Sequence, residues 1–175
     1  MDRVAILLTT VEVAVAFAGF GGLAALLGRR RTRDDARIDV MRLRAILEGS
    51  LLTGGAAALP VVLLAYGASE RVVWRVASVL FLMCALLVVG AWTSRIRLAL
   101  REGAAFQSGI LSFFYGIAIA MTVLLIASLV AGSGRSFAMY LSALYTILFG
   151  MAILFLRLVA SLVGASAQGD EQAPD

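Results

Sequence analysis

Five long apolar runs occupy most of this chain and leave little sequence for anything else. A helix needs about 20 apolar residues to cross the hydrocarbon core of a bilayer, and every run reaches that length. We therefore predict an all-α integral membrane protein, a bundle of five transmembrane helices over residues of about 4–28, 36–66, 72–98, 108–132 and 136–163. Residues 1–164 would form one membrane domain, and the small, polar, acidic segment 165–175 a short disordered tail.

The composition supports lipid as the medium. Hydrophobic residues make up 62% of the chain, charged residues 15%, and the mean hydropathy is +0.98. Soluble domains average about 45–50% apolar and about 25% charged residues. A soluble protein of 175 residues could not bury so much apolar surface. The net charge of +4 comes from arginines beside the apolar runs, so we read it as a topological signal and expect no nucleic acid partner.

The arginines predict the orientation. Five spans place the termini on opposite sides of the membrane, and the side with more Lys and Arg is cytoplasmic. Ten arginines share one side and four share the other, so we expect the N-terminus outside, the C-terminus in the cytoplasm, and a multi-pass protein of a cell membrane, such as a bacterial inner membrane. The ten are Arg29, Arg30, Arg31, Arg33, Arg37, Arg42, Arg44, Arg95, Arg97 and Arg101.

Four arginines between the first two spans are candidates for contact with lipid headgroups: Arg29, Arg30, Arg31 and Arg33. Basic side chains near the surface attract anionic lipid by about 1 kcal/mol each. They would either anchor the chain without lipid specificity or bind anionic lipid selectively. Membrane lipids are therefore expected partners in both cases.

Glu12 is the leading functional candidate. It lies about 12 Å along the first predicted helix. Its face also carries Ala5, Thr9, Ala16 and Gly19, so we expect this face to point into protein. A carboxylate inside the membrane costs about 2.5–3.5 kcal/mol or more and will be paired, hydrated or protonated. It marks either an ion route or a structural ion pair, for which Arg75 is the expected partner.

A second set of charges lies towards the arginine-rich side. Glu48 and Arg157 fall at similar depths in the second and fifth predicted helices, so they can pair if those helices touch. Arg44 competes for Glu48 from one turn earlier on the same helix.

The second predicted helix contains the most deformable backbone in the membrane. Pro60 removes one backbone hydrogen bond and should bend the helix, with a neighbouring side chain satisfying the freed carbonyl group. Gly54 and Gly55 precede it. This stretch is either a hinge or a site of close helix packing.

Polar and aromatic residues suggest how the later helices face one another. Ser108, Ser112, Tyr115 and Thr122 share one face of the fourth helix, and Tyr140 belongs to a similar stripe on the fifth. We expect the two stripes to face each other or a shared cavity, as structural contacts or as a water-lined route. Tyr66, Trp74 and Trp92 fall near the ends of runs, where they would set helix depth at the interfaces.

Several functions are excluded by what is missing. The chain has no His, which removes His-ligated haem, most metal sites and the triads that use histidine. No Lys is present for a phosphate-binding loop, and no aqueous loop is long enough for a soluble active site. We therefore expect no enzyme activity, no cofactor and no metal.

Three functions remain. The first is a channel or carrier for a small ion or proton, assembled from several copies and using the Glu12 carboxylate. The second is a non-catalytic accessory subunit of a larger membrane complex. The third is a lipid-interacting or membrane-shaping protein that acts through the arginines from Arg29 to Arg44. Small residues in the first helix, at Ala14, Ala18 and Gly22, favour close association with another helix in the first two cases.

Overall fold

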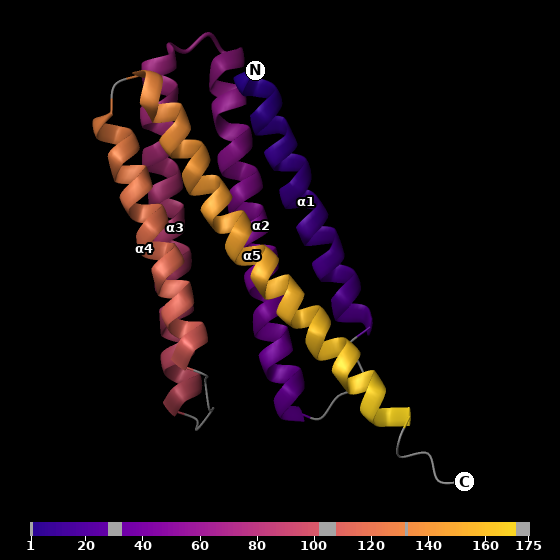
Figure 1. Cartoon of the computed structure of the whole chain (residues 1–175). Helices are drawn as coiled ribbons and strands as arrows, with labels where there is room; N and C mark the ends of the chain where they lie inside the picture. The colour runs from indigo at the N-terminus through magenta and orange to yellow at the C-terminus, as the bar shows by residue number, and fades with distance from the viewer. Residues whose placement is uncertain (1, 28–32, 102–107, 132, 171–175) are drawn as a thin grey trace.

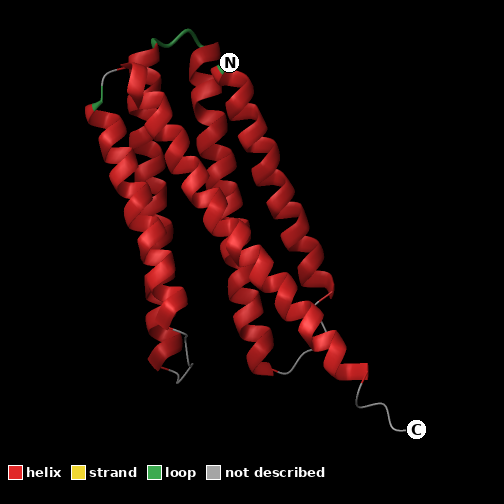
Figure 2. Ribbon diagram, in the orientation of Figure 1, coloured by secondary structure: helices red, strands yellow, loops and turns green. Residues whose placement is uncertain are grey.

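The protein is a bundle of five α-helices. The computed structural model describes residues 2–27, 33–101, 108–131 and 133–170. Every helix in this part of the chain contains a segment long and apolar enough to cross a membrane, which confirms the prediction of five apolar helices (Figure 2). The helices are α1 (Arg3–Leu27), α2 (Arg33–Ala65), α3 (Glu70–Arg101), α4 (Ser108–Val130) and α5 (Ser133–Asp170).

The largest difference from the predicted bounds lies at the end of α5. This helix continues to Asp170, so residues 165–170 are helical rather than a disordered tail. Ala165 and Ala167 are strong helix formers, and the helix simply continues past its membrane-spanning segment, Arg135–Ala160. The remaining tail residues, 171–175, lie outside the described residues.

The turn between α2 and α3 is closed by a glycine. Gly67 has a φ angle of 75°, a left-handed conformation that side chains disfavour. Its N–H donates to the Leu64 carbonyl at 2.9 Å, and the N–H of Ala68 donates to the Leu63 carbonyl at 3.2 Å. This pair of bonds satisfies the last carbonyl groups of α2 and lets the chain reverse into α3.

The helices form a row with one helix across it. α1, α2, α3 and α4 contact one another in sequence order, and α5 contacts all four. Figure 1 shows α5 running diagonally over the row, while α3 and α4 diverge from α2 and α5 towards the lower end of the view. The start of α1 and the end of α5 lie at opposite ends of the bundle (Figure 1). Among the described residues, α1 packs on α2 and α5 and touches α3 through the ion pair of Arg3 with Glu70. One side of α1 is therefore left uncovered.

Aromatic rings fill the half of the bundle nearest the α2–α3 turn, which we call the packed half. Tyr140 of α5 is fully buried between Trp74 and Phe81 of α3, with ring centroids 5.9 and 5.6 Å away. Small residues at Ala57 and Ala77, both 0% exposed, make room for these rings. Trp74 therefore lies in the core and not at an interface as we predicted, because its ring packs on α5 and not on headgroups.

The outer surface of the bundle is strongly apolar. Leu51, Leu87 and Val15 are 74%, 72% and 64% exposed, and they come from three different helices. Apolar side chains exposed over so much of a surface mark contact with membrane or protein and not with water. The surface thus agrees with the composition in pointing to a multi-pass membrane protein.

Candidate functional sites

Glu12 lies on the uncovered side of α1. Its side chain is exposed, as are those of Ala5, Thr9 and Ala16, while the opposite face of α1 buries Leu7 and Ala14 against the bundle. The chain's own bundle therefore does not cover this face, and a contact of the face with protein stays a prediction about an assembly. α1 packs on the bundle through another face, on which Leu7, Thr10 and Ala14 recur with a helical period.

The predicted partner of Glu12 does not reach it. Arg75 is exposed on α3, and no ion pair joins it to Glu12, although both residues are described. Among the described residues, Glu12 makes no hydrogen bond or ion pair. Arg3, by contrast, pairs with Glu70 at 2.7 Å at the outer edge of the packed half.

Glu48 is the centre of a charged cluster at the opposite end of the bundle. We call this end, where α2 begins and α3 finishes, the arginine end. The Glu48 carboxylate accepts bonds from Arg44 Nε at 2.7 Å, from Arg95 Nη1 at 3.0 and 3.1 Å, and from Trp92 Nε1 at 2.9 Å. These donors come from α2 and α3, so the cluster ties the two helices together.

This cluster corrects the predicted pairing of Glu48 with Arg157. The Arg157 side chain is exposed on α5 and takes no part in the cluster. Arg44, the predicted competitor, does bind Glu48, and Arg95 was missed as a partner. The contact with Arg95 depends on α3 lying beside α2 at this end, which residue spacing alone does not reveal. Trp92, which was predicted to set helix depth, also donates its indole N–H to the Glu48 carboxylate and so links α3 to α2.

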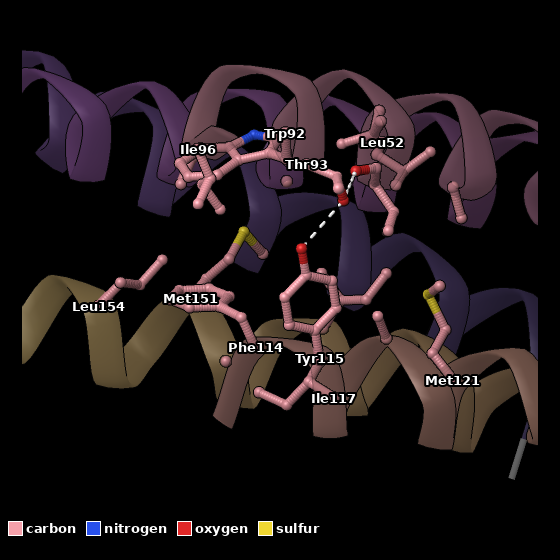
Figure 3. A pocket seen from close by; sticks show the side chains of 18 residues that line it. Leu52, Trp92, Thr93, Ile96, Phe114, Tyr115, Ile117, Met121, Met151 and Leu154 are labelled. Carbon is pink, nitrogen blue, oxygen red and sulfur yellow. Dashed lines mark hydrogen bonds between the residues drawn. The ribbon is translucent and has the colours of Figure 1, made fainter. Parts of the chain in front are cut away.

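A cleft of about 150 Å³ opens beside the cluster (Figure 3). Four helices line it, and nearly all of the lining atoms are apolar. Its wall carries the rings of Trp92 and Phe114, which stack with centroids 6.3 Å apart and planes 17° apart. Its lining residues are Ala45, Gly49, Leu52, Ala85, Val88, Val89, Trp92, Thr93, Ile96, Phe114, Tyr115, Ile117, Ala118, Met121, Ile147, Gly150, Met151 and Leu154.

Two glycines hold the floor of the cleft together. A Cβ atom on Gly49 would lie 2.8 Å from Met151 Sδ, and one on Gly150 would lie 2.8 Å from Ile117 Cδ1. Any larger residue would push α5 away from α2 or from α4. The cleft therefore lies beside two close contacts of α5, one with α2 and one with α4, and α3 completes its wall.

The polar stripe predicted on α4 is divided among different contacts. Tyr115 OH lies 3.1 Å from Thr93 Oγ1 of α3, and Figure 3 shows this bond at the rim of the cleft. Thr122 donates to the Ala118 carbonyl of its own helix at 2.8 Å. Ser112 is exposed but has an interaction, and the side chain of Ser108 lies outside the described residues. Tyr115 lines the cleft that α4 and α5 share, which favours the shared-cavity alternative for that residue, whereas Tyr140 lies in the packed half and does not line the cleft.

The buried polar contact between α4 and its neighbours lies elsewhere and was missed. Ser128 of α4 is 3.0 Å from Ser78 of α3, hydroxyl to hydroxyl, and it donates to the Ser136 carbonyl at 3.2 Å. All three residues are buried in the packed half. Single serines in apolar helices are frequent enough that their pairing shows only when the helices are in place.

Tyr140 of α5 supplies a hydrogen bond that Pro60 removes from α2. Its hydroxyl donates to the Ala56 carbonyl at 2.6 Å, and Ala56 is four residues before Pro60. That carbonyl would bond the N–H of residue 60 in a regular helix, and proline has none. The prediction that a neighbouring side chain satisfies the freed carbonyl is therefore confirmed, and α2 continues unbroken through Pro60 to Ala65.

The two glycines before Pro60 differ in their surroundings. A Cβ atom on Gly54 would lie 3.7 Å from the Ala14 side chain of α1, whereas nothing lies within 4 Å of one on Gly55. Gly54 thus belongs to a close contact between α1 and α2, which favours the packing alternative at that position. Gly55 is exposed on the outer surface.

The predicted headgroup arginines cannot be placed. Arg29, Arg30 and Arg31 lie outside the described residues, and Arg33 begins α2 with a side chain that is also outside them.

Comparison with known proteins adds no identity to this geometry. No family model, curated protein or solved structure matches the chain. The features that bear on function are the five apolar helices, the exposed carboxylate of Glu12 and the cleft at the arginine end.

Proposed function

We propose that this chain is a multi-pass protein of a cell membrane that assembles with copies of itself and conducts a small cation or protons along the contacts between them. Its N-terminus would lie outside and its arginine end in the cytoplasm, because ten of the arginines belong to that side. A bacterial inner membrane is the proposed location. Glu12 would be the acidic group on the conduction path.

The observation that carries this proposal is that the Glu12 side chain is exposed and has no partner among the residues that the structure describes. Glu12 lies nine residues beyond Arg3, about 13.5 Å along α1 and so within the span Arg3–Leu23. A carboxylate facing hydrocarbon at that depth would cost about 2.5–3.5 kcal/mol or more. Assembly removes this cost when a second copy covers the face and supplies water, a cation or a polar neighbour.

The surroundings of Glu12 suit a contact between helices. Ala5, Thr9, Ala16 and Gly19 lie on the same exposed face, and small residues allow two helix backbones to approach closely in lipid. Within one chain the cleft offers no polar route, since its lining is apolar. The conduction path is therefore placed between copies of the chain and not inside one.

Flux from liposomes tests this proposal. The purified protein should pass protons or a monovalent cation, and Glu12→Gln should abolish that flux while Glu12→Asp retains part of it. Thr9→Val is the matched control, because Thr9 shares the face but has no ionisable group. An assembly mass of several copies in mild detergent is also expected. A monomer, or a Glu12→Gln variant that conducts normally, would overturn the proposal.

An accessory subunit is the second candidate, and Arg75 favours it. Arg3 and Glu70 touch, which sets α1 and α3 at a common height. From that level Glu12 is nine residues down α1 and Arg75 five residues down α3, a difference of about 6 Å in depth. A long arginine side chain covers this distance, so Arg75 of a neighbouring copy could pair with Glu12 purely to fix registry. In that case Glu12→Gln and Arg75→Gln would each weaken assembly, and no ion would flow.

Orientation has its own test. A reporter that is active only in the cytoplasm, fused to either end in turn, should be silent at the N-terminus and active at the C-terminus. Activity at both ends would contradict an odd number of spans.

A further inference from the structure

The cleft at the arginine end is suited to take up the hydrocarbon chain of a lipid. It is lined by residues of α2 and α3 on one side and of α4 and α5 on the other, and the lining is apolar (Figure 3). Apolar cavities of this size stay free of water and take up small apolar molecules. In a membrane the molecules next to the opening are the hydrocarbon chains of lipids.

The size of the cleft decides between a lipid chain and a protein segment. A helix with its side chains is about 10–12 Å across, far wider than a cleft of about 150 Å³ can admit. A single hydrocarbon chain is narrow enough to lie among the side chains of Trp92, Phe114 and Met151, which line the cleft (Figure 3). The shape thus favours one acyl chain.

The charged cluster next to the cleft suits an anionic headgroup. Ala45 and Gly49 of the lining flank Glu48 in α2, and Trp92 of the lining donates to its carboxylate. Two guanidinium groups share that one carboxylate, Arg44 through Nε and Arg95 through Nη1. A guanidinium has five N–H donors, so both arginines have further N–H groups to offer a phosphate.

The depth of the cluster agrees with a headgroup. The span of α3, Glu70–Leu98, is 29 residues long, or about 43 Å, which exceeds the roughly 30 Å of hydrocarbon. Arg95 lies in the last turn of that span and is therefore at the level of the lipid phosphates. The cleft extends from there into the hydrocarbon, as the tail of a lipid does.

We propose that the cleft binds one acyl chain of an anionic phospholipid, whose phosphate is held by Arg44 and Arg95. This inference rests on the proposed membrane location but not on ion conduction. The lipid would fill the space that α2, α3, α4 and α5 leave between them at the arginine end.

Trp92 provides a direct probe of the occupant. The chain has two tryptophans, and Trp74→Phe leaves Trp92 as the one fluorophore of this kind. Phosphatidylglycerol or phosphatidylcholine with brominated acyl chains is titrated into the full-length protein in detergent. Phosphatidylglycerol should quench Trp92 at a roughly tenfold lower mole fraction, since hydrogen bonds to a charged group contribute about 1.5–3 kcal/mol and each 1.4 kcal/mol is tenfold. The same titration on the parent protein shows whether Trp74→Phe has disturbed the site.

Matched variants separate the tail from the headgroup. Ala118→Phe fills the cleft and should abolish saturable quenching by either lipid, whereas Ala120→Phe, on the exposed side of the same helix, should not. Ala45→Leu fills the cleft from α2 if Ala118→Phe fails to fold. Arg95→Gln should reduce the preference for phosphatidylglycerol to that of phosphatidylcholine, and Arg97→Gln, on an exposed position two residues later, should preserve it.

Three results would overturn the proposal. The first is equal quenching by the two lipids in the parent protein. The second is normal quenching in both Ala118→Phe and Ala45→Leu. The third is a change in assembly mass with unchanged lipid quenching in these variants, which would assign the cleft to a second copy of the chain. None of these results bears on whether Glu12 carries ions.

Discussion

The packed half and the arginine end use the same helices in opposite ways. In the packed half, alanines on α2 and α3 bring the backbones close enough for Trp74, Phe81 and Tyr140 to form a continuous core. At the arginine end the same helices separate, and an ion cluster and a cleft take the place of that core. Apolar helices gain little hydrophobic free energy when they move from lipid to a protein contact, so their association depends on van der Waals packing. Close packing therefore occurs where small residues let two helix backbones approach each other.

Enlarging a buried alanine in each half tests this contrast most strongly. Ala57→Leu in the packed half should lower the free energy of unfolding by about 1–3 kcal/mol, because no space exists for the added carbons. Ala118→Leu at the cleft should leave stability unchanged or raise it, because space is present there. Equilibrium unfolding in mixed micelles, followed by circular dichroism, measures both. Equal losses in the two variants would mean that the halves are packed alike.

The bond between Tyr140 and α2 comes next in size. Tyr140→Phe should cost about 1 kcal/mol by leaving the Ala56 carbonyl without its donor. In a Pro60→Ala background the cost should nearly vanish, since the N–H of residue 60 can then bond Ala56 itself. A double-mutant cycle on unfolding free energies measures this coupling. Additive costs would show that the hydroxyl does not serve the carbonyl that Pro60 leaves free.

The cluster at the arginine end should matter least for stability. Glu48→Gln is expected to cost about 0.5 kcal/mol or less, because partly exposed ion pairs contribute only about 0–1 kcal/mol. It should at the same time strengthen the preference for phosphatidylglycerol, since the carboxylate no longer competes with a phosphate for Arg44 and Arg95. Glu70→Gln, which breaks the Arg3 pair at the other end, is the control. A large loss of stability in Glu48→Gln would show that the cluster, and not lipid, holds this end together.

The sequence predicts the helices well because membrane crossing sets their length. Apolar runs located all five, and the bounds differ by a few residues at most ends. The exception, the extension of α5 to Asp170, involves polar and small residues whose helicity continues past the membrane and leaves no hydrophobic signal.

The sites were less predictable because they depend on which helix faces which. Pro60 predicts that one backbone carbonyl of α2 loses its N–H donor, but the sequence does not show that α5 crosses α2 and places the Tyr140 hydroxyl there. Glu48 was recognised as a charge needing a partner, yet Arg95 is 47 positions away along the chain. Glu12 was expected to point into protein on the evidence of its small neighbours, but the face of α1 with Leu7, Thr10 and Ala14 packs on the bundle instead. Small residues can serve a second copy as well as the first.

The Tyr140 hydroxyl also fixes how α2 and α5 stand relative to each other. Sliding either helix by one turn, about 5.4 Å, would break this hydrogen bond and leave the Ala56 carbonyl without a donor in an apolar interior. A single proline thereby sets the register of the two helices, because it leaves one backbone carbonyl of α2 without an acceptor bond inside its own helix. Any gating motion of this protein would have to pivot around that point and not slip past it.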